Sequence, residues 1–318
     1  MDVGDPETEL SSGAAAPTVS LSPLLEGADD GVDDADPVDS NDPQVTAELW
    51  ERLARRGYPR PMSVEEAAGL LERAGDERFR RKAAVLGRFA SEQGPEQALY
   101  EALLEALGYR YNQQPFVKLA HAAPVAALRR AALPVLAQQR PMVLRHWLLA
   151  VSGLADAGPA APPRLPEGLG PAMERKEWHL FRVRPSNHPA LRINGAAQLV
   201  ARFLDGGLLS GLASSSVAPR QLVVALTVDG QDGGTAAIGA GRARDLAVNV
   251  VLPMLHSLAG GEDSPHMDTY RRFPKLQGNE VLGEMVRQLL LEEWRPAVNS
   301  ARRQQGLLHL AALLRGGG

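Results

Sequence analysis

Apolar residues recur at three- and four-residue spacing through most of the chain after residue 43, the pattern of amphipathic helices. Phe79, Ala83, Leu86 and Phe89 form one such face, and Leu99, Leu103 and their neighbours form another. No fixed repeat length accompanies the pattern, which favours packed helical hairpins over a solenoid. We therefore predict an all-α fold, a compact array of roughly ten to fourteen helices after a disordered N-terminal segment.

Capping residues divide this pattern into separate helices. Ser63 followed by Glu66 is a capping box and predicts a helix start. Asp76 is predicted to cap the next helix, because Asp is a preferred N-cap residue. Gly94-Pro95 then predicts the end of that helix and the start of another.

Two stretches lack a periodic apolar face. Residues 1–43 are rich in Asp, Gly, Pro, Ser and Ala and predict a disordered acidic tail. Residues 157–171 contain five prolines and predict a linker or one long surface loop. The rest then forms an N-terminal helical half, 44–156, and a C-terminal helical half, 172–318.

Three segments of the C-terminal half are ambiguous or irregular. Residues 221–228 suit a buried strand or a buried helix, and the flanking helices favour the helix. Residues 177–183 suit a strand or a first helical turn, and the two prolines in 184–189 predict a loop. The next helix is expected to start at Asn194 or Gly195, and the acidic stretch ending at Asp268 is expected to be a loop.

Composition excludes several classes of protein. The 318-residue chain is 44% hydrophobic and has no cysteine, which excludes disulfides, thiolate nucleophiles and cysteine-based zinc sites. No apolar run approaches the roughly 20 residues of a membrane-spanning helix. The N-terminus lacks the basic and apolar regions of a signal peptide, so a cytoplasmic location is expected.

Charge is distributed unevenly along the chain. Residues 1–51 contain fourteen Asp or Glu and no Lys or Arg, whereas the remainder carries 34 Lys or Arg against 24 Asp or Glu. A basic body attracts polyanions, and the acidic segment is then a candidate intramolecular competitor. The alternative is that arginine richness reflects a coding bias and the tail only increases solubility.

Two stretches supply candidate binding residues. The first, from Gly239 to His256, places Arg242, Arg244, Asp245 and Asn249 on or beside an otherwise apolar helix. Such groups need partners inside the fold or a ligand.

The second stretch is the densest group of anion-binding side chains: Arg182, Arg184, Asn187, His188 and Arg192. Guanidinium groups hold phosphate or carboxylate in bidentate fashion, and a proline-restrained loop would preorganise them. The structural alternative is that these groups cap helix ends and pair with carboxylates such as Asp245.

Known catalytic and cofactor motifs are incomplete. Gly239-Ala-Gly241 suggests a dinucleotide fingerprint, but Arg244 stands where the third glycine is required. No P-loop and no Gly-x-Ser-x-Gly elbow is present, so we expect no cofactor. His256, Asp263, His266 and Asp268 lie near one loop, yet such residues are common in solvated loops, and no metal is expected.

A family resemblance covers the chain from about Asp76 to Arg315. It resembles the helical C-terminal portion of a bacterial family known only as the domain of unknown function numbered 2851. The motifs that carry the resemblance are residues 76–79 with Arg81-Lys82, 94–101, 105–109, 184–189, 249–253 and 303–309. The resemblance implies no established activity. Longer members begin with a β-rich, nuclease-like half, in whose place this chain has the acidic tail and one or two helices, so nuclease chemistry is not carried over.

Two functional hypotheses follow. The first is a non-catalytic helical binding or scaffolding protein with an arginine-rich site for a polyanion or a partner. The expected partner is a nucleic acid, or a separate protein that supplies the missing half. The alternative is a phosphoester hydrolase with His188 as acid and base and the arginines as clamps. Arg302 to His309 is a further polar stretch, expected to be a solvated face or a clamp between helices.

Overall fold

The computed structural model describes residues 43–155, 164–230, 234–261, 264–278, 280–290 and 292–315. The predicted acidic tail lies outside these residues, apart from Pro43. Within them the fold is all-α, as predicted, and β structure is limited to two isolated bridges. The α-helices are α2 (Pro43–Ala54), α3 (Val64–Gln93), α4 (Pro95–Leu107), α5 (Tyr109–Ala122), α6 (Val125–Ala132), α7 (Arg140–Ser152), α8 (Pro189–Arg202), α9 (Leu208–Ser215), α10 (Pro219–Leu226), α11 (Ala240–Leu246), α12 (Leu252–Ala259), α13 (Pro265–Arg271), α14 (Glu280–Leu289) and α15 (Ala301–Arg315).

Shorter helical turns connect these elements. The 3-10 turns are η1 (Ala137–Gln139), η2 (Arg175–Glu177), η3 (Pro185–Asn187) and η6 (Glu292–Ala297). One π-helical turn, η5 (Ala247–Val251), joins α11 to α12 into a continuous rod.

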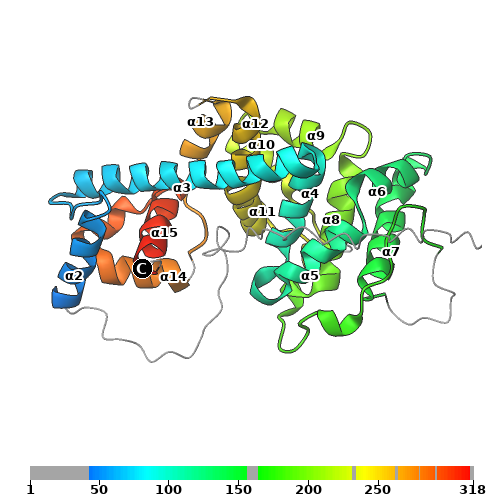
Figure 1. The fold of residues 1–318 in the computed structure, drawn as a ribbon, viewed down its shortest axis with the longest axis horizontal. Helices are drawn as coiled ribbons and strands as arrows, with labels where there is room; N and C mark the ends of the chain where they lie inside the picture. Colours follow the sequence, from blue (N-terminus) through cyan, green and yellow to red (C-terminus); the bar gives the residue numbers. More distant parts are fainter. Residues whose placement is uncertain are drawn as a thin grey trace, which may run out of the picture.

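Helix α3 runs from the region of α2 and α15 to that of α4 and α12, and it contributes to two separate hydrophobic cores (Figure 1). Its first half packs with α2, α14, η6 and α15 in the smaller core, around Trp50, Leu71 and Trp294. Its second half packs with α4 to α13 in the larger core, around Phe79 and Tyr100. A single long helix therefore holds both cores in one arrangement.

The two cores do not follow the two halves of the sequence. Residues from both sides of 157–171 occur in each core. Residues 164–171 lie against the larger core, where Leu165 and Leu169 pack and the Gly170 amide donates to the carbonyl oxygen of Ala122 at 2.6 Å. Residues 156–163, the remainder of the predicted linker region, lie outside the described residues.

The predicted break at Asp76 is wrong, because α3 continues through it without interruption. Asp76 is 5% exposed and accepts hydrogen bonds from Arg302 on α15 and Arg271 on α13 rather than from the start of a helix. The predicted caps at Ser63 and at Gly94-Pro95 are confirmed, since the Ser63 side chain accepts from the Glu66 amide and α4 begins at Pro95. The prediction from residue preference failed at Asp76 because the arginines that bind its carboxylate are distant in sequence.

Helices α3 and α15 cross at two glycines. A Cβ atom on Gly306 would lie 2.0 Å from the carbonyl oxygen of Leu71, and one on Gly75 would lie 2.1 Å from that of Arg302. Only glycine permits backbones to approach so closely.

The polar residues of α15 join this crossing to the rest of the fold. Gln305 accepts from Lys82 at 2.7 Å and from Arg78 at 3.1 Å. Gln304 bonds both the amide and the carbonyl of Leu276, at 2.7 and 3.1 Å. The stretch from Arg302 to His309 is therefore an interhelical clamp, one of the two alternatives predicted for it.

Other segments of the C-terminal half differ in part from expectation. Residues 219–226 form α10, as favoured, and Val228 then pairs with Ile238 in an isolated bridge. Helix α8 begins at Pro189, earlier than predicted, because the His188 side chain caps it. Pro265–Arg271 forms α13 where a loop was expected, with Ser264 as its N-cap. Residues 178–183 continue irregularly after η2.

None of the described helices has the length and apolar character that crossing a membrane requires.

His309 supports a prediction about acid stability. Burial lowers the pKa of His309 from 6.5 to about 4, so at neutral pH its ring is uncharged and forms no ion pair with Glu77, 3.6 Å away. In the unfolded chain this ring takes up its proton near its ordinary pKa of 6.5. The free energy of unfolding should therefore fall as the pH drops from 6.5 to 4. Thermal melts across this range should show a smaller decrease for His309→Phe, and equal decreases in the two proteins would contradict the assignment.

Candidate functional site

A pocket of about 590 Å³ lies between the two cores, within the size range of small-ligand sites. One side comes from α5, the segment 179–187, α8 and α11 of the larger core, and the other from residues 276–278, α14 and α15. Its polar and aromatic lining residues are Tyr109, Tyr111, Asn112, His179, Phe181, Arg182, Arg184, Ser186, Asn187, Arg192, Thr235, Arg242, Asp245, Asn249, Gln277, Gln304 and Gln305.

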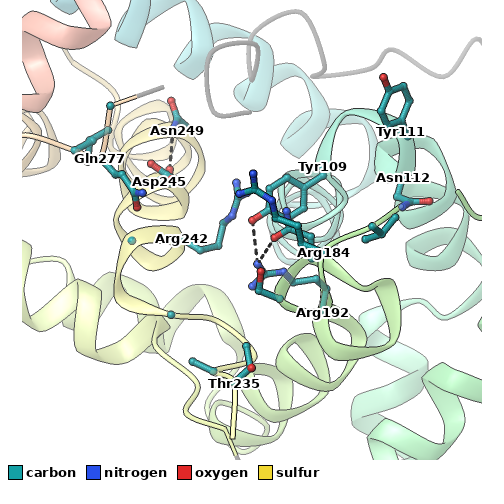
Figure 2. Close-up of a pocket in the computed structure, with 18 of the residues that line it drawn as sticks. Tyr109, Tyr111, Asn112, Arg184, Arg192, Thr235, Arg242, Asp245, Asn249 and Gln277 are labelled. Atoms are coloured by element: carbon teal, nitrogen blue, oxygen red, sulfur yellow. Dashed lines mark hydrogen bonds between the residues drawn. The ribbon is translucent and has the colours of Figure 1, made fainter. Parts of the chain in front are cut away.

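Tyr109 is at the centre of this pocket. Figure 2 shows Arg184, Arg192 and Arg242 gathered around it. The guanidinium carbon of Arg242 lies 4.0 Å from the centroid of the Tyr109 ring, and that of Arg192 lies 5.3 Å from it. Two cations therefore contact one aromatic ring, an arrangement that holds them close together despite their repulsion.

Arg192 is the most buried of these cations. It is 5% exposed and donates to the carbonyl oxygen of Ala237, the hydroxyl of Tyr109 and the side-chain oxygen of Asn187, at 2.8, 2.9 and 3.1 Å. Its Nε atom is buried without a hydrogen-bond partner. Burial lowers the pKa of Arg192, and the Arg242 charge adds to this effect. All three of these hydrogen-bond partners are neutral, so they stabilise the charge of Arg192 without cancelling it.

Within the described part of the chain, arginines outnumber carboxylates in the lining of this pocket. Among the described residues, no carboxylate oxygen lies within 4.0 Å of a guanidinium nitrogen of Arg182, Arg184, Arg192 or Arg242. By contrast, Arg271, Arg302 and Arg303 are paired with Glu72, Asp76 or Asp268. Asp245 is the single carboxylate among the described lining residues, against four arginines. The field of this cavity therefore favours an anion.

The loop that carries Arg182 and Arg184 is fixed by a neighbouring side chain. Asn112 donates to the carbonyl oxygen of His179 at 2.9 Å and accepts from its amide at 2.8 Å. Trp178, buried against Phe116, donates its indole N–H to the carbonyl oxygen of Ser152 at 2.8 Å. The residues after His179 thus leave an anchored point and extend along the pocket edge.

A buried lysine lies beneath the pocket and binds two of its lining residues. Lys82 is 2% exposed and donates to the side-chain oxygens of Asn249 and Gln305, both of which line the pocket. Burial is the main cause that lowers the pKa of Lys82, followed by the Arg78 charge, while Asp245 opposes the shift. Asn249 also donates to the carbonyl oxygen of Asp245 at 2.9 Å, which ties α11 to the π-helical turn.

Backbone irregularities concentrate at the same place. Tyr109 and Arg182 have φ angles of 48° and 53°, and no other non-glycine residue in the described part has a positive φ. Both line the pocket. The π-helical turn that carries Asn249 is a third irregularity. Such features cost stability and cluster at functional sites, which supports a binding role for this cavity.

The structure brings together seven of the nine predicted binding residues in this pocket: Arg182, Arg184, Asn187, Arg192, Arg242, Asp245 and Asn249. Arg244, also on α11, is not among the residues that line it. His188 is not among them either, and its Nδ1 accepts the Ala190 amide at 3.3 Å as the N-cap of α8.

Sequence reasoning missed the aromatic residues and the lysine. Tyr109, Tyr111 and Phe181 line the pocket, and Lys82 lies beneath it. The sequence contains one indication of these aromatic residues, the aromatic-rich stretch 177–183, whose pattern predicts only a strand or a helical turn.

The described residues contain no cluster of three or more potential metal ligands. His256 bonds Ser264 at 2.6 Å and His266 bonds Ser216 at 3.1 Å, so each ring nitrogen involved has a hydroxyl partner. Asp263, another of the four residues near this loop, lies outside the described residues.

Comparison of the chain with protein-family models, curated proteins and solved structures finds no match. The resemblance to the domain of unknown function numbered 2851 therefore remains a prediction.

Proposed function

We propose that the protein binds a phosphate-bearing polyanion in the pocket between its two cores and acts as a binding or scaffolding protein. The observation that carries this proposal is the set of four pocket arginines without a carboxylate partner among the described residues. Keeping unpaired cations close together costs free energy that an anionic ligand would recover. Guanidinium groups are also the side chains best suited to phosphate oxygens.

The fixed geometry of the pocket supports the same proposal. Asn112, Tyr109 and the Arg192 contacts hold the pocket in place before a ligand arrives, and preorganisation lowers the entropic cost of binding.

The alternative of a phosphoester hydrolase has less support. His188, its proposed acid and base, caps α8 and is not among the lining residues. Asp245 is the single carboxylate among the described lining residues, so the carboxylate pair of a metal-dependent or acid–base hydrolase has no counterpart there.

Arg242→Ala should weaken polyanion binding by about tenfold, since a charge-assisted contact contributes on the order of 1.5 kcal/mol. Binding of inorganic polyphosphate and of a single-stranded oligonucleotide to the full chain can be measured by calorimetry and fluorescence anisotropy. The slope of log affinity against log salt should decrease by about one for a lost phosphate contact.

Arg244→Ala is the matched control. It removes the same charge from the same short helix but outside the pocket, so affinity should change by less than about twofold. Equal effects of the two substitutions, or no binding of either probe by the wild-type chain, would overturn the proposed function.

A further inference from the structure

The edge of the pocket carries two exposed aromatic rings. Tyr111 is 59% exposed and Phe181 is 70% exposed, and they are the aromatic members of the exposed large hydrophobic residues in the described part of the chain. Both line the pocket. A Phe side chain left in water forgoes the free energy of burial, so the position of these rings at the edge of a cationic cavity requires an explanation.

Each of these rings contacts a neighbouring side chain. Tyr111 lies against His179 with ring centroids 4.7 Å apart and an interplanar angle of 36°. The Arg182 guanidinium lies 5.1 Å from the centroid of the Phe181 ring. Exposed aromatic rings and a guanidinium group therefore lie together at the pocket edge, and side chains of both kinds stack nucleobases in other proteins.

One clamp holds both rings in position. Asn112 follows Tyr111 directly in α5, and its two hydrogen bonds fix His179, two residues before Phe181. The relative placement of the aromatic edge therefore does not depend on the ligand. Figure 2 shows Tyr111 on α5, away from the Arg184, Arg192 and Arg242 group, so the aromatic edge and the arginine centre are separate parts of one cavity.

The combination of arginines and exposed aromatic rings in one cavity favours some anions over others. Inorganic phosphate chains and acidic peptides have no planar bases to stack on exposed aromatic rings. In a duplex the faces of the bases are stacked on one another inside the double helix. Single-stranded nucleic acid presents phosphates and free base faces at adjacent positions along one chain. We infer that the ligand is single-stranded nucleic acid, with phosphates at Arg184, Arg192 and Arg242 and bases stacked on Tyr111 and Phe181.

This inference rests on the proposed polyanion function but can fail separately from it. The test compares three labelled probes of equal length, each of roughly 12 nucleotides, a length within the range of one single-strand site. They are a single-stranded oligonucleotide, its duplex, and an abasic strand that keeps the sugar-phosphate backbone without bases. Full-length wild-type protein should bind the single strand at least about fivefold more tightly than either of the other two, because one stacked base is worth this factor or more.

Phe181→Ala should reduce single-strand affinity by about fivefold, leave the affinity for the abasic strand unchanged and leave the salt slope unchanged. Phe181→Tyr should retain the wild-type affinity because it keeps the ring face. Leu136→Ala is the control for removing an exposed apolar side chain, since Leu136 is 66% exposed and is not among the lining residues.

Three outcomes would overturn the inference: equal binding of the abasic and base-containing strands, tighter binding of the duplex, or equal effects of Phe181→Ala and Leu136→Ala. If the abasic strand and polyphosphate still bind in an Arg242-dependent way, the polyanion function stands without the preference for single strands. If no probe binds in an Arg242-dependent way, both proposals fail.

Discussion

Gly306→Ala should destabilise the protein by about 3 kcal/mol, at the upper end of what overpacking usually costs. The added Cβ would lie 2.0 Å from the carbonyl oxygen and 2.8 Å from the carbonyl carbon of Leu71, and these are backbone atoms within α3. Neither helix can yield locally, because the hydrogen bonds of Gln304 and Gln305 flank the contact. The variant helices have to separate, which opens the smaller core.

The matched control is Gly69→Ala on α3. A Cβ atom there meets nothing within 4 Å, so alanine should stabilise the helix by up to about 1 kcal/mol through its higher propensity. Chemical denaturation with both variants separates the close contact from the general effect of glycine in a helix. Equal stability of Gly306→Ala and the wild type would show that the two helices do not cross at this residue.

Asp76→Ala should cost about 3 kcal/mol for a different reason. The Asp76 carboxylate is 7% exposed and receives two hydrogen bonds of 2.7 Å from Arg302 and one of 3.0 Å from Arg271. Removing it leaves two partly buried guanidinium groups without that partner, and such one-sided losses cost roughly 3–5 kcal/mol. We take the lower end because Arg302 keeps Glu72 and Arg271 is 32% exposed.

A surface ion pair supplies the comparison. Glu51 and Arg55 lie 3.9 Å apart with side chains that are 73% and 76% exposed, so Glu51→Ala should change stability by less than about 1 kcal/mol. The midpoints of urea denaturation for the two variants should therefore differ clearly. Similar midpoints would mean that the contacts of Asp76 are worth no more than those of an exposed pair.

The all-α fold could be predicted because helical periodicity is a local property. The spacing from Phe79 to Phe89 describes a buried face of α3, and the Ser63 and Pro95 helix starts depend only on nearby residues. Asp76 shows where this reasoning ends: its partners are 195 and 226 residues away, so a residue typical of helix starts stands in the middle of one. The close crossing at Gly75 and Gly306 depends equally on distant segments.

Much of the pocket could be predicted because its cations are concentrated in two stretches of sequence. What could not be predicted is which side chains face the cavity. Arg242 faces it and Arg244, two residues later, does not, a difference set by the rotation of a short helix. Tyr109 has a positive φ although a bulky residue rarely adopts one, so its residue type does not indicate this conformation. His188 was a reasonable acid–base candidate by residue type, but its ring serves as a helix cap.

Hydrogen exchange of the full-length chain with and without a saturating single-stranded oligonucleotide tests the central claim most directly. The non-helical segments 180–184 and 234–239 border the pocket, and their amides should exchange measurably in the free protein. We predict that exchange slows in both segments when the oligonucleotide binds and that Arg242→Ala raises the oligonucleotide concentration needed for half of this change by about tenfold. Slower exchange in other segments while these two remain unchanged would contradict a polyanion site between the two cores.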